Sequence, residues 1–403
     1  MDREQLDSIF MPYEKTLRAQ EKFRKRLGVK EVEQPTYEQY ITGSIKRFDA
    51  TKNAFKLLQT DDPSGEDFRN SFKKKTGDDN WTTALPYSDL EPGYRIGQSL
   101  AAASWRMCQD YHPENLPVTP PEGRFEVNDR AWMSRLIKKV GLMFGADRVH
   151  IARVDQRWVY EGIDIPQEFV IMVVVQHRPT LLDTAPSHFS WASATDAYAR
   201  LKYITTHLSD FICGLGYPAQ YRETLGWGPE MLVVPSAIDA GIGEFARTGR
   251  VLSPEYGINM RIKPITTDLP LEVDKPISFG VHDFCMACES CATYCPSNAV
   301  PFGEPQEEPP NLLFHNPGYK KWYIHADRCL TFWAANKKEW LSCGGRCIAV
   351  CPGRCIAVCP WNKPINLFHN AVRWSAIHAP SLIKKLLVWA DVKVYERKKS
   401  IKQ

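Results

Sequence analysis

The sequence predicts an α+β core that is followed by a cysteine-rich module and a helical tail. Two observations lead to this interpretation. Residues 125–280 alternate between stretches of helical and strand periodicity, and ten of the twelve cysteines fall between Cys285 and Cys359. The chain of 403 residues is 43% hydrophobic, which is sufficient for a large buried core. We divide it into four regions, namely residues 1–124, 125–280, 281–364 and 365–403.

The two outer regions differ from the core in composition. The first region is polar and charged, and it closes with the proline-rich stretch YHPENLPVTPPEGRF at residues 111–125. Such a composition favours an extended accessory segment that wraps around the core over a compact domain. In the last region, the sequence predicts an amphipathic helix that begins near Ser381. We expect its Leu382, Leu386 and Trp389 to pack on the core or at a dimer contact, with a membrane partner or lipid as the alternatives.

The core region contains two predicted helices and a buried strand. The first helix is expected over residues 128–145, with its N-cap at the first or second of these residues, and it runs into a strand. The run FVIMVVV at residues 169–175 predicts a buried strand because it is short and rich in β-branched residues. Residues 195–217 predict a second helix that ends at Gly214 or Gly216.

Composition and charge limit the classes of function. Lys plus Arg (51) barely exceed Asp plus Glu (47), so no strong positive field favours nucleic acid as a partner. The longest strongly apolar run, residues 169–175, is far shorter than the ~18 residues that a membrane-spanning helix requires. The start, MDREQLDSIF, has neither a twin-arginine motif nor an apolar signal core, as expected for a cytosolic protein or for the mature form of an exported one.

The cysteine spacing is the most specific motif. Cys285, Cys288, Cys291 and Cys295 form the pattern C-x2-C-x2-C-x3-C-P, the bacterial ferredoxin spacing for [4Fe-4S] clusters. In this pattern, the first three thiolates bind one cluster and the fourth binds another. Dense C-x-x-C groups in a large chain favour metal clusters over disulfides. The two isolated cysteines upstream, Cys108 and Cys213, are expected to be ordinary buried thiols.

The octapeptide GRCIAVCP occurs twice in tandem, at residues 345–352 and 353–360. Two clusters need eight thiolates, and the chain downstream of the motif offers two more than this requires. We assign one cluster to Cys285, Cys288, Cys291 and Cys359, and the other to Cys295, Cys329, Cys343 and Cys355. Cys347 and Cys351, in the first copy, are the alternatives, and we interpret the duplication as a sequence artefact that adds a loop of eight residues.

Several longer stretches resemble the respiratory reductive dehalogenases. They include GADRVHIARVDQRWVYEG, FICGLGYPA and SAIDAGIGEFARTGRVLSPEYGINMRIKP, and the resemblance runs from about residue 125 to residue 364. It implies a nitroreductase-like core that binds a base-off corrinoid (cobalamin, a cobalt cofactor). It also implies a bacterial-ferredoxin-like module with two [4Fe-4S] clusters. No D-x-H-x-x-G motif occurs, as expected where no histidine replaces the lower base of the corrinoid.

The same resemblance implies catalytic residues beside the corrinoid, whose other contacts the sequence does not specify. It matches Tyr203 to a tyrosine that donates a proton, a suitable role because a phenol with a pKa near ~10 stays protonated. It matches Arg261 to the basic residue that stabilises the tyrosinate, with Lys263 as the alternative. Where some members carry a Gly-Asn pair near the active site, this chain reads QYRETLGWGPEM, and Trp227 is expected in that region.

Together these features predict a reductive dehalogenase that removes halogen from a small organohalide as the terminal reductase of organohalide respiration. The alternatives are an epoxyqueuosine reductase-like enzyme, which would use the same cofactors on tRNA, and a plain ferredoxin-like electron carrier without a corrinoid. The resemblance implies an upstream electron donor, a membrane anchor protein and a place on the outer face of the cytoplasmic membrane after export. A homodimer is a further expectation, no nucleic acid partner is expected, and a full-length chain would instead be cytoplasmic.

Overall fold

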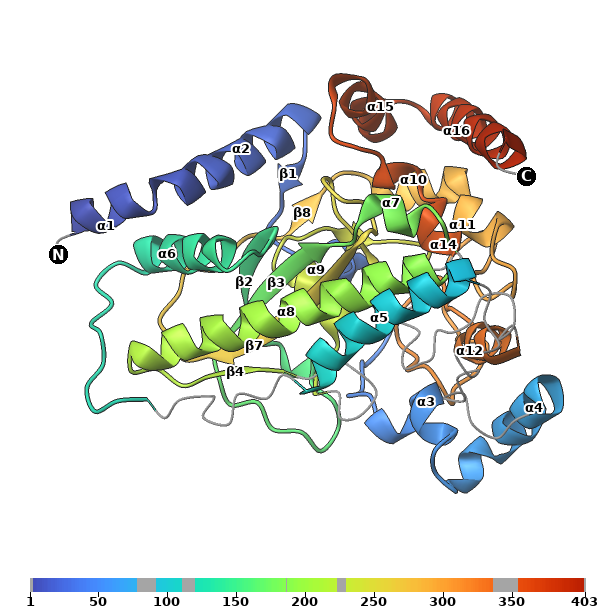
Figure 1. Ribbon diagram of the computed structural model, residues 1–403, viewed down its shortest axis with the longest axis horizontal. Helices are drawn as coiled ribbons and strands as arrows, with labels where there is room; N and C mark the ends of the chain where they lie inside the picture. The colour runs from blue at the N-terminus through green and yellow to red at the C-terminus, as the bar shows by residue number, and fades with distance from the viewer. Residues whose placement is uncertain are drawn as a thin grey trace.

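The computed structural model describes residues 3–77, 92–110, 120–185, 187–222, 230–335 and 354–401. Within these ranges, the side chains of residues 92–94, 106–110, 333, 354 and 394–401 are not described. Helices surround a central sheet, so the predicted mixture of helix and sheet is confirmed (Figure 1).

The centre of the molecule is a four-stranded antiparallel sheet with the strand order β2-β3-β7-β4 (Figure 1). Its strands are β2 (Arg148–Arg153), β3 (Phe169–Gln176), β4 (Ala219–Tyr221) and β7 (Met260–Thr267). The buried strand predicted at residues 169–175 is confirmed as β3. All seven of these residues are buried, because β3 lies between two other strands and both of its faces are covered.

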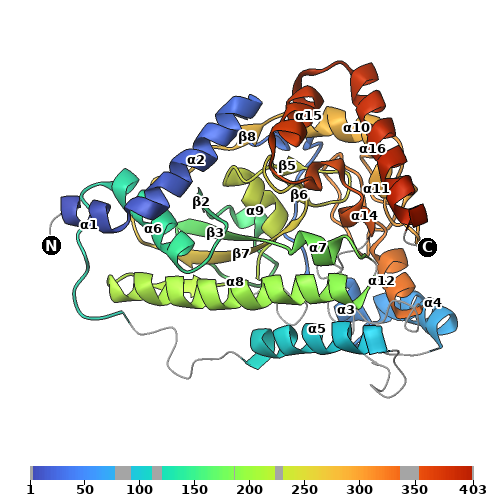
Figure 2. The same ribbon diagram turned by 45° about the horizontal axis from the view of Figure 1, so that its top comes forward.

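Helices cover both faces of this sheet (Figure 2). On one face, α6 (Arg130–Met143) and α8 (His188–Gly214) form an apolar cluster with Ile171, Val173 and Val175 of β3. On the other face, α9 (Val233–Asp239) packs on the alternate residues of the same strand, such as Met172 and Val174. This alternation follows from the two-residue period of a strand.

The two helices predicted for the core are confirmed, with one boundary corrected. α6 begins after Asp129, whose carboxylate accepts a hydrogen bond from the backbone amide of Trp132 at 2.9 Å. α8 ends at Gly214, as predicted, but it begins well before residue 195. Its true start is at His188, because Ser187 and the third residue of the helix cap each other's backbone amides in a capping box.

The N-terminal region is largely helical, and its helices lie against the core at several places. They are α1 (Arg3–Ile9), α2 (Met11–Leu27), α3 (Ala54–Leu57), α4 (Glu66–Thr76) and α5 (Pro92–Asp110). Both ribbon views show α5 running beside α8, and β1 (Lys30–Glu31) pairs with β8 (Ile277–Ser278) (Figures 1 and 2). The described part of this region thus lies around the core, and most of the proline-rich stretch for which an extended segment was expected, residues 111–125, lies outside the described residues.

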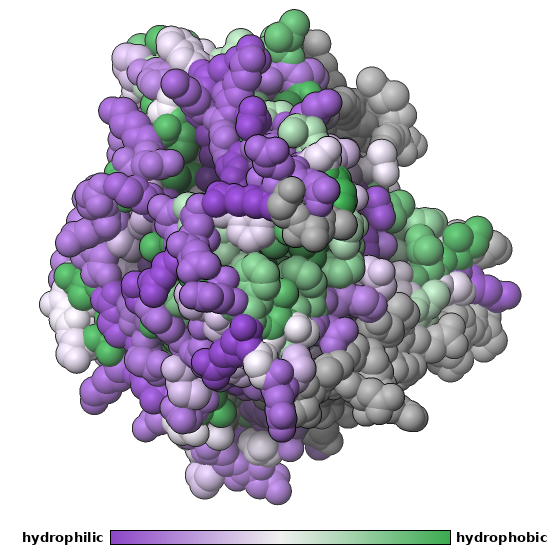
Figure 3. Space-filling view, turned by 90° about the vertical axis from the view of Figure 1, so that its left-hand side faces the viewer, coloured by the Kyte–Doolittle hydropathy of each residue, from purple (hydrophilic) through white to green (hydrophobic). Residues whose placement is uncertain are grey.

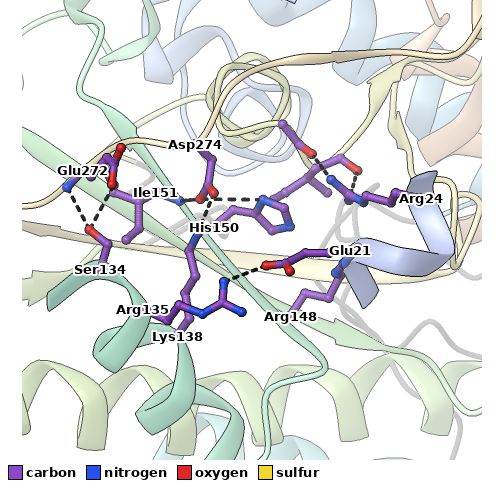
Figure 4. A network of polar contacts seen from close by, with 12 residues as sticks. Glu21, Arg24, Ser134, Arg135, Lys138, Arg148, His150, Ile151, Glu272 and Asp274 are labelled. Carbon is purple, nitrogen blue, oxygen red and sulfur yellow. Dashed lines mark hydrogen bonds and ion pairs between the residues drawn. The ribbon is translucent and has the colours of Figure 1, made fainter. Parts of the chain in front are cut away.

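Polar contacts fix α2 and α6 to the sheet (Figure 4). Arg24 of α2 forms an ion pair with Glu255 at 2.6 Å, and the Glu255 side chain is only 3% exposed. Asp274 accepts a hydrogen bond from the backbone amide of Ile151 in β2 at 2.8 Å, and it also pairs with Lys138 of α6. The face that carries α1 is largely hydrophilic, with hydrophobic residues gathered at its centre (Figure 3).

The C-terminal part of the chain consists of short helices followed by two longer ones. The short helices are α10 (Val281–Cys288), α11 (Ser290–Thr293), α12 (Ala326–Ala335) and α14 (Arg354–Ala357). The longer ones are α15 (Leu367–His378) and α16 (Ser381–Ile401), so the predicted helix start at Ser381 is confirmed. Among the described residues, no helix has the length and apolar character needed to cross a bilayer.

The tail helix packs on the core through a different face from the one expected. Val388 is buried among residues of α10 and α15, and Asp391 pairs with Lys363 at 2.8 Å. The side chains of Leu382 and Trp389 are 71% and 62% exposed, and Leu386 is also exposed. The expectation that these three side chains pack on the core is therefore wrong. They lie on the outer side of α16.

Candidate functional site

Four cysteines surround a small buried cavity. Cys285 and Cys288 come from α10, Cys291 from α11, and Cys359 from the chain that follows α14. Burial raises the pKa of Cys285 to about 12, and burial together with the neighbouring thiols raises the pKa values of Cys291 and Cys359. Cys285 is buried and the other three are partly buried. Thiols that must become thiolates in such a place require a positive charge among them, and a metal cluster supplies it.

The geometry of these thiols suits a cluster better than a single ion. In the described part of the chain, no three His, Cys, Asp or Glu side chains approach closely enough to hold one metal ion. The four thiols instead line the wall of a common cavity. A cubane has its iron atoms at its corners, so its ligands surround it rather than converge on one point. The residues therefore fit a [4Fe-4S] cluster.

Local backbone geometry creates this arrangement. Glu244, a buried residue of β5 (Glu244–Phe245), accepts hydrogen bonds from the backbone amides of Phe279 and Val281 and so fixes the start of α10. Burial raises the pKa of Glu244. At the other end, Glu289 has a φ of 48°, which breaks the helix between Cys288 and Cys291. This break allows successive cysteines to face the same cavity.

The thiols assigned to the second cluster are described only in part. Cys295 follows α11, and its sulfur accepts a hydrogen bond from the backbone amide of Ala299 at 3.3 Å. Ala299 accepts from the amide of His325, which brings the start of α12, and with it Cys329, to this side of the module. Cys355 lies on α14 in the same buried cluster as Cys288 and Cys359. Cys343, Cys347 and Cys351 lie outside the described residues, so the ligand set of this cluster stays a prediction.

The structure does not bring Tyr203 and Arg261 together. Tyr203 is 40% exposed, and its ring lies 4.2 Å from that of His207, one turn further along α8. Arg261 is 4% exposed on β7, and its guanidinium carbon lies 5.2 Å from the ring centroid of Tyr198. Because residues five apart on a helix point in different directions, Tyr198 faces β7 and Tyr203 does not.

The helical period of α8 distinguishes the two tyrosines. The buried side of α8 includes Tyr198, Leu201, Thr205, Leu208 and Ile212, at steps of three and four residues. Tyr198 belongs to this stripe, and Tyr203 does not. A tyrosine on the core-facing stripe is the one that a buried arginine from the sheet can reach.

A second tyrosine lies between two lysines in the same interface of α8 and β7. Lys202 donates a hydrogen bond to the Tyr221 hydroxyl at 2.9 Å, and the Lys263 ammonium lies 4.6 Å from the centroid of the same ring. Both lysines are buried. Lys263, the alternative base partner, thus lies at Tyr221, and Arg261 lies at Tyr198. Trp227 lies outside the described residues.

A cavity of about 330 Å³ opens beside the cysteine module. Aromatic and aliphatic side chains form most of its wall, and the aromatic ones include Tyr37, Phe48, Trp158, Tyr160, Phe245 and Trp322. Polar groups also line it, among them Asn316 and Lys321, and burial lowers the pKa of Lys321 to about 8. Phe314 lines the cavity and belongs to the same buried apolar cluster as Tyr198.

One short segment separates this cavity from the four thiols. Phe245 and Gly249 line the aromatic cavity, whereas Ala246, Arg247 and Thr248 line the cysteine cavity. A single stretch of chain, residues 245–249, therefore forms the wall that the two cavities share.

Comparison with known proteins confirms the resemblance to reductive dehalogenases. Residues 284–363 match the family of 4Fe-4S dicluster domains. The chain is 27% identical over 360 residues to a tetrachloroethene reductive dehalogenase of Sulfurospirillum multivorans, which covers 80% of this chain and 67% of that protein. It is 29% identical over 314 residues to the enzyme of the same name from Dehalobacter restrictus, which covers 64% of this chain and 53% of that protein.

A solved structure of a reductive dehalogenase, described in terms of B12-dependent dehalogenation, has the same fold with a TM-score of 0.68. It is 22% identical, and the match covers 92% of this chain and 49% of that one. An epoxyqueuosine reductase of Lactococcus garvieae is 34% identical over 67 residues, only 17% of this chain. The chain thus spans about half to two thirds of the length of its reductive dehalogenase relatives.

Proposed function

We propose that this chain is a corrinoid- and iron–sulfur-dependent reductive dehalogenase. The observation that carries the proposal is the set of four clustered thiols that shares a wall with an aromatic cavity, together with the buried guanidinium of Arg261 over the ring of Tyr198. Electrons, a hydrophobic reaction space and a proton donor are the three requirements of the reaction. In the net reaction, the organohalide takes up two electrons and one proton. The carbon–halogen bond breaks, halide leaves, and a carbon–hydrogen bond forms.

The aromatic cavity suits part of a corrinoid ring. A corrinoid is a large, flat group with an apolar face and a polar periphery, and the cavity offers aromatic walls with Asn316 and Lys321 among them. When bound, a reduced corrinoid supplies the low-potential electrons that cleave the carbon–halogen bond. The finer description of the core as nitroreductase-like, and the domain boundaries at residues 124, 280 and 364, belong to the same proposal.

Electrons reach this cavity from the cysteine module. The segment that includes Ala246, Arg247 and Thr248 is all that lies between the two cavities where they share a wall. Short separation favours electron transfer without a further carrier. We assign the nearer cluster to Cys285, Cys288, Cys291 and Cys359, and the farther one to Cys295, Cys329, Cys343 and Cys355, with Cys347 and Cys351 as alternatives.

Tyr198 takes the role of proton donor that the resemblance implied for Tyr203. Its phenol holds a proton at Oη at neutral pH, and the buried Arg261 stabilises the phenolate that remains after transfer. Arg261 suits this role because a guanidinium stays charged even when buried. The pair of Lys202 and Lys263 around Tyr221 adds positive potential to the same interface.

The substrate class that fits is a small organohalide. Aromatic and apolar walls bind such a molecule by exclusion of water, since it has few hydrogen-bonding groups. We further propose a place in organohalide respiration, with export to the outer face of the cytoplasmic membrane, an upstream electron donor, a membrane anchor protein and a homodimer. The exposed apolar side chains of α15 and α16, among them Phe368, Leu382 and Trp389, support a protein contact there.

Anaerobic turnover of the reconstituted full chain tests the proposal. With reduced viologen as donor and a panel of chloroalkanes, chloroalkenes and halophenols, we expect halide release from at least one compound. Bound cobalt with about eight iron atoms per chain is expected in the same preparation. Both cofactors without halide release from any compound would refute dehalogenation and place epoxyqueuosine reduction first. Iron without cobalt binding would support a plain electron carrier.

A further inference from the structure

The wall between the two cavities contains a buried cation, Arg247. Its residue is 1% exposed, and it is among the largest fully buried side chains of the described chain. It lines the same cavity as the four thiols of Cys285, Cys288, Cys291 and Cys359. A permanent charge in this position acts on whatever occupies that cavity, because little water screens it.

Most hydrogen bonds of this guanidinium go to neutral carbonyl groups. Nε and Nη2 donate to the carbonyl oxygen of Cys285 at 3.2 and 3.0 Å, and Nη1 donates to those of Pro301 and Gly303 at 2.9 and 2.8 Å. These bonds satisfy the donors and fix their direction, but they leave the positive charge in place.

One carboxylate lies within ion-pair distance of Arg247 in the described part of the chain. It is Glu289, whose Oε1 is 3.4 Å from Nη2. The Glu289 side chain is 36% exposed, and its Oε1 also accepts a hydrogen bond from the backbone amide of Gly303 at 2.7 Å. Since water screens the partly exposed carboxylate more than the buried guanidinium, the ion pair offsets only part of the positive charge.

The Arg247 guanidinium also packs against a stack of aromatic rings. The Arg247 guanidinium carbon lies 4.6 Å from the ring centroid of Trp322, and the indole nitrogen of Trp322 donates to the carbonyl of Gly303 at 2.9 Å. His282 stacks on this indole with ring centroids 5.2 Å apart, and Tyr40 stacks on His282 with ring centroids 5.0 Å apart. Arg247 therefore cannot turn toward solvent without breaking a stack that spans three aromatic side chains.

We infer that Arg247 is a positioning residue that sets the reduction potential of the cluster held by Cys285, Cys288, Cys291 and Cys359. Reduction adds one electron to the cluster and makes it one unit more negative, with no proton taken up. A fixed positive charge stabilises the reduced form more than the oxidised form and so raises the potential. The inference rests on the iron–sulfur part of the proposed function and is independent of the corrinoid and of the organohalide.

Redox titration of the full chain with reconstituted clusters, followed by electron paramagnetic resonance, tests this role. In Arg247→Gln, we expect the equilibrium constant for reduction of one cluster to fall about tenfold or more. For a one-electron couple, tenfold corresponds to about 59 mV. Arg247→Lys keeps the charge and is expected to restore most of the wild-type potential. The second cluster should keep its potential in both variants.

Glu289→Gln is a second variant. It tests the same charge effect even if the protein does not keep its clusters when Arg247 is replaced. Glutamine can still accept from the Gly303 amide, so the fold should be retained, and loss of the negative charge should shift the potential upward. Unchanged potentials in Arg247→Gln and Glu289→Gln at full iron content would overturn the inference. An equal fall of the reduction potential in Arg247→Lys and Arg247→Gln would also overturn the inference. The hydrogen bonds of the guanidinium, and not its charge, would then set the potential. If Arg247→Gln loses iron, the test rests on Glu289→Gln. An upward shift of the cluster's reduction potential in that variant supports the inference, and no shift or a downward shift overturns it.

This readout separates the inference from the proposed function. The titration uses no organohalide, so a protein without halide release can still show the expected shifts. A protein that releases halide but shows no shift in the variants would contradict the role of Arg247 alone.

Discussion

The guanidinium of Arg261 lies over the ring of Tyr198, with its central carbon 5.2 Å from the ring centroid. The two side chains come from β7 and α8, and both are buried. A buried cation beside a phenol lowers the free energy of the phenolate more than that of the neutral phenol. This relationship makes Tyr198 the acid of the proposed reaction and leads to the first two expectations.

Tyr198→Phe should abolish most halide release, because phenylalanine keeps the packing but has no proton to donate. A loss on the order of 100-fold or more is expected for a general acid. The matched control is Tyr203→Phe on the same helix, whose ring is 40% exposed and lies against His207. We expect this control to keep nearly full activity with unchanged cobalt and iron contents. The opposite ranking of the two variants would restore Tyr203 as the donor.

Arg261→Gln should reduce halide release by about 100-fold, similar to the loss of one group that stabilises a developing negative charge. Arg261→Lys should recover part of the activity, since it keeps the charge but not the planar group that covers the ring. Steady-state rates at saturating substrate measure the effect. Lys263→Gln serves as the comparison, because Lys263 lies at Tyr221, and a larger loss there than in Arg261→Gln would favour Lys263 as the base partner.

Cys359→Ser should lower the iron content from about eight to about four atoms per chain, because Cys359 lies with three cysteines of the ferredoxin motif around one cavity. Cys351→Ser is the matched control, since Cys351 occupies the same place in the first copy of the octapeptide. We expect it to keep both clusters. Iron analysis and the spectrum of the reduced protein give the answer, and loss of a cluster in Cys351→Ser alone would assign the ligand to the first copy.

Deletion of one octapeptide copy should leave both clusters in place. Removal of residues 345–352 joins Gly344 to Gly353, and eight cysteines then remain between Cys285 and Cys359. This is the number that two [4Fe-4S] clusters require. Iron content and halide release should match those of the intact chain, and loss of iron would show that the duplicated residues contribute a ligand.

The contribution of Asp239 to stability should fall as the pH rises from about 4 to about 7. Its carboxylate accepts hydrogen bonds from the Tyr37 hydroxyl and the Trp158 indole, and burial raises its pKa to about 7. Over this range the folded state holds a proton that the unfolded state has lost, so the free energy of unfolding decreases with pH. In Asp239→Asn this part of the slope should disappear. Urea unfolding at several pH values measures it, and equal slopes in both proteins would contradict the assignment.

Much of the fold was accessible from the sequence because its signals are local. The run at residues 169–175 predicted β3, and the cap at Asp129 predicted the start of α6. The spacing of Cys285, Cys288 and Cys291 predicted a cluster site because the chemistry of the cluster limits the spacing of its ligands. The helices of the N-terminal region were not predicted, because packing on the core stabilises helices whose composition alone is polar.

The sequence by itself determined the cofactor class of the cysteine module, and the family resemblance supplied the residue types of the candidate site, a tyrosine on one helix and an arginine on one strand. Tertiary structure decided which tyrosine meets Arg261, since that depends on the face that α8 turns toward β7. It also decided that Cys359 closes the first thiol set, and that one segment around Arg247 separates this set from the aromatic cavity. These relationships join residues that are distant in the chain, and only long-range packing brings them into contact.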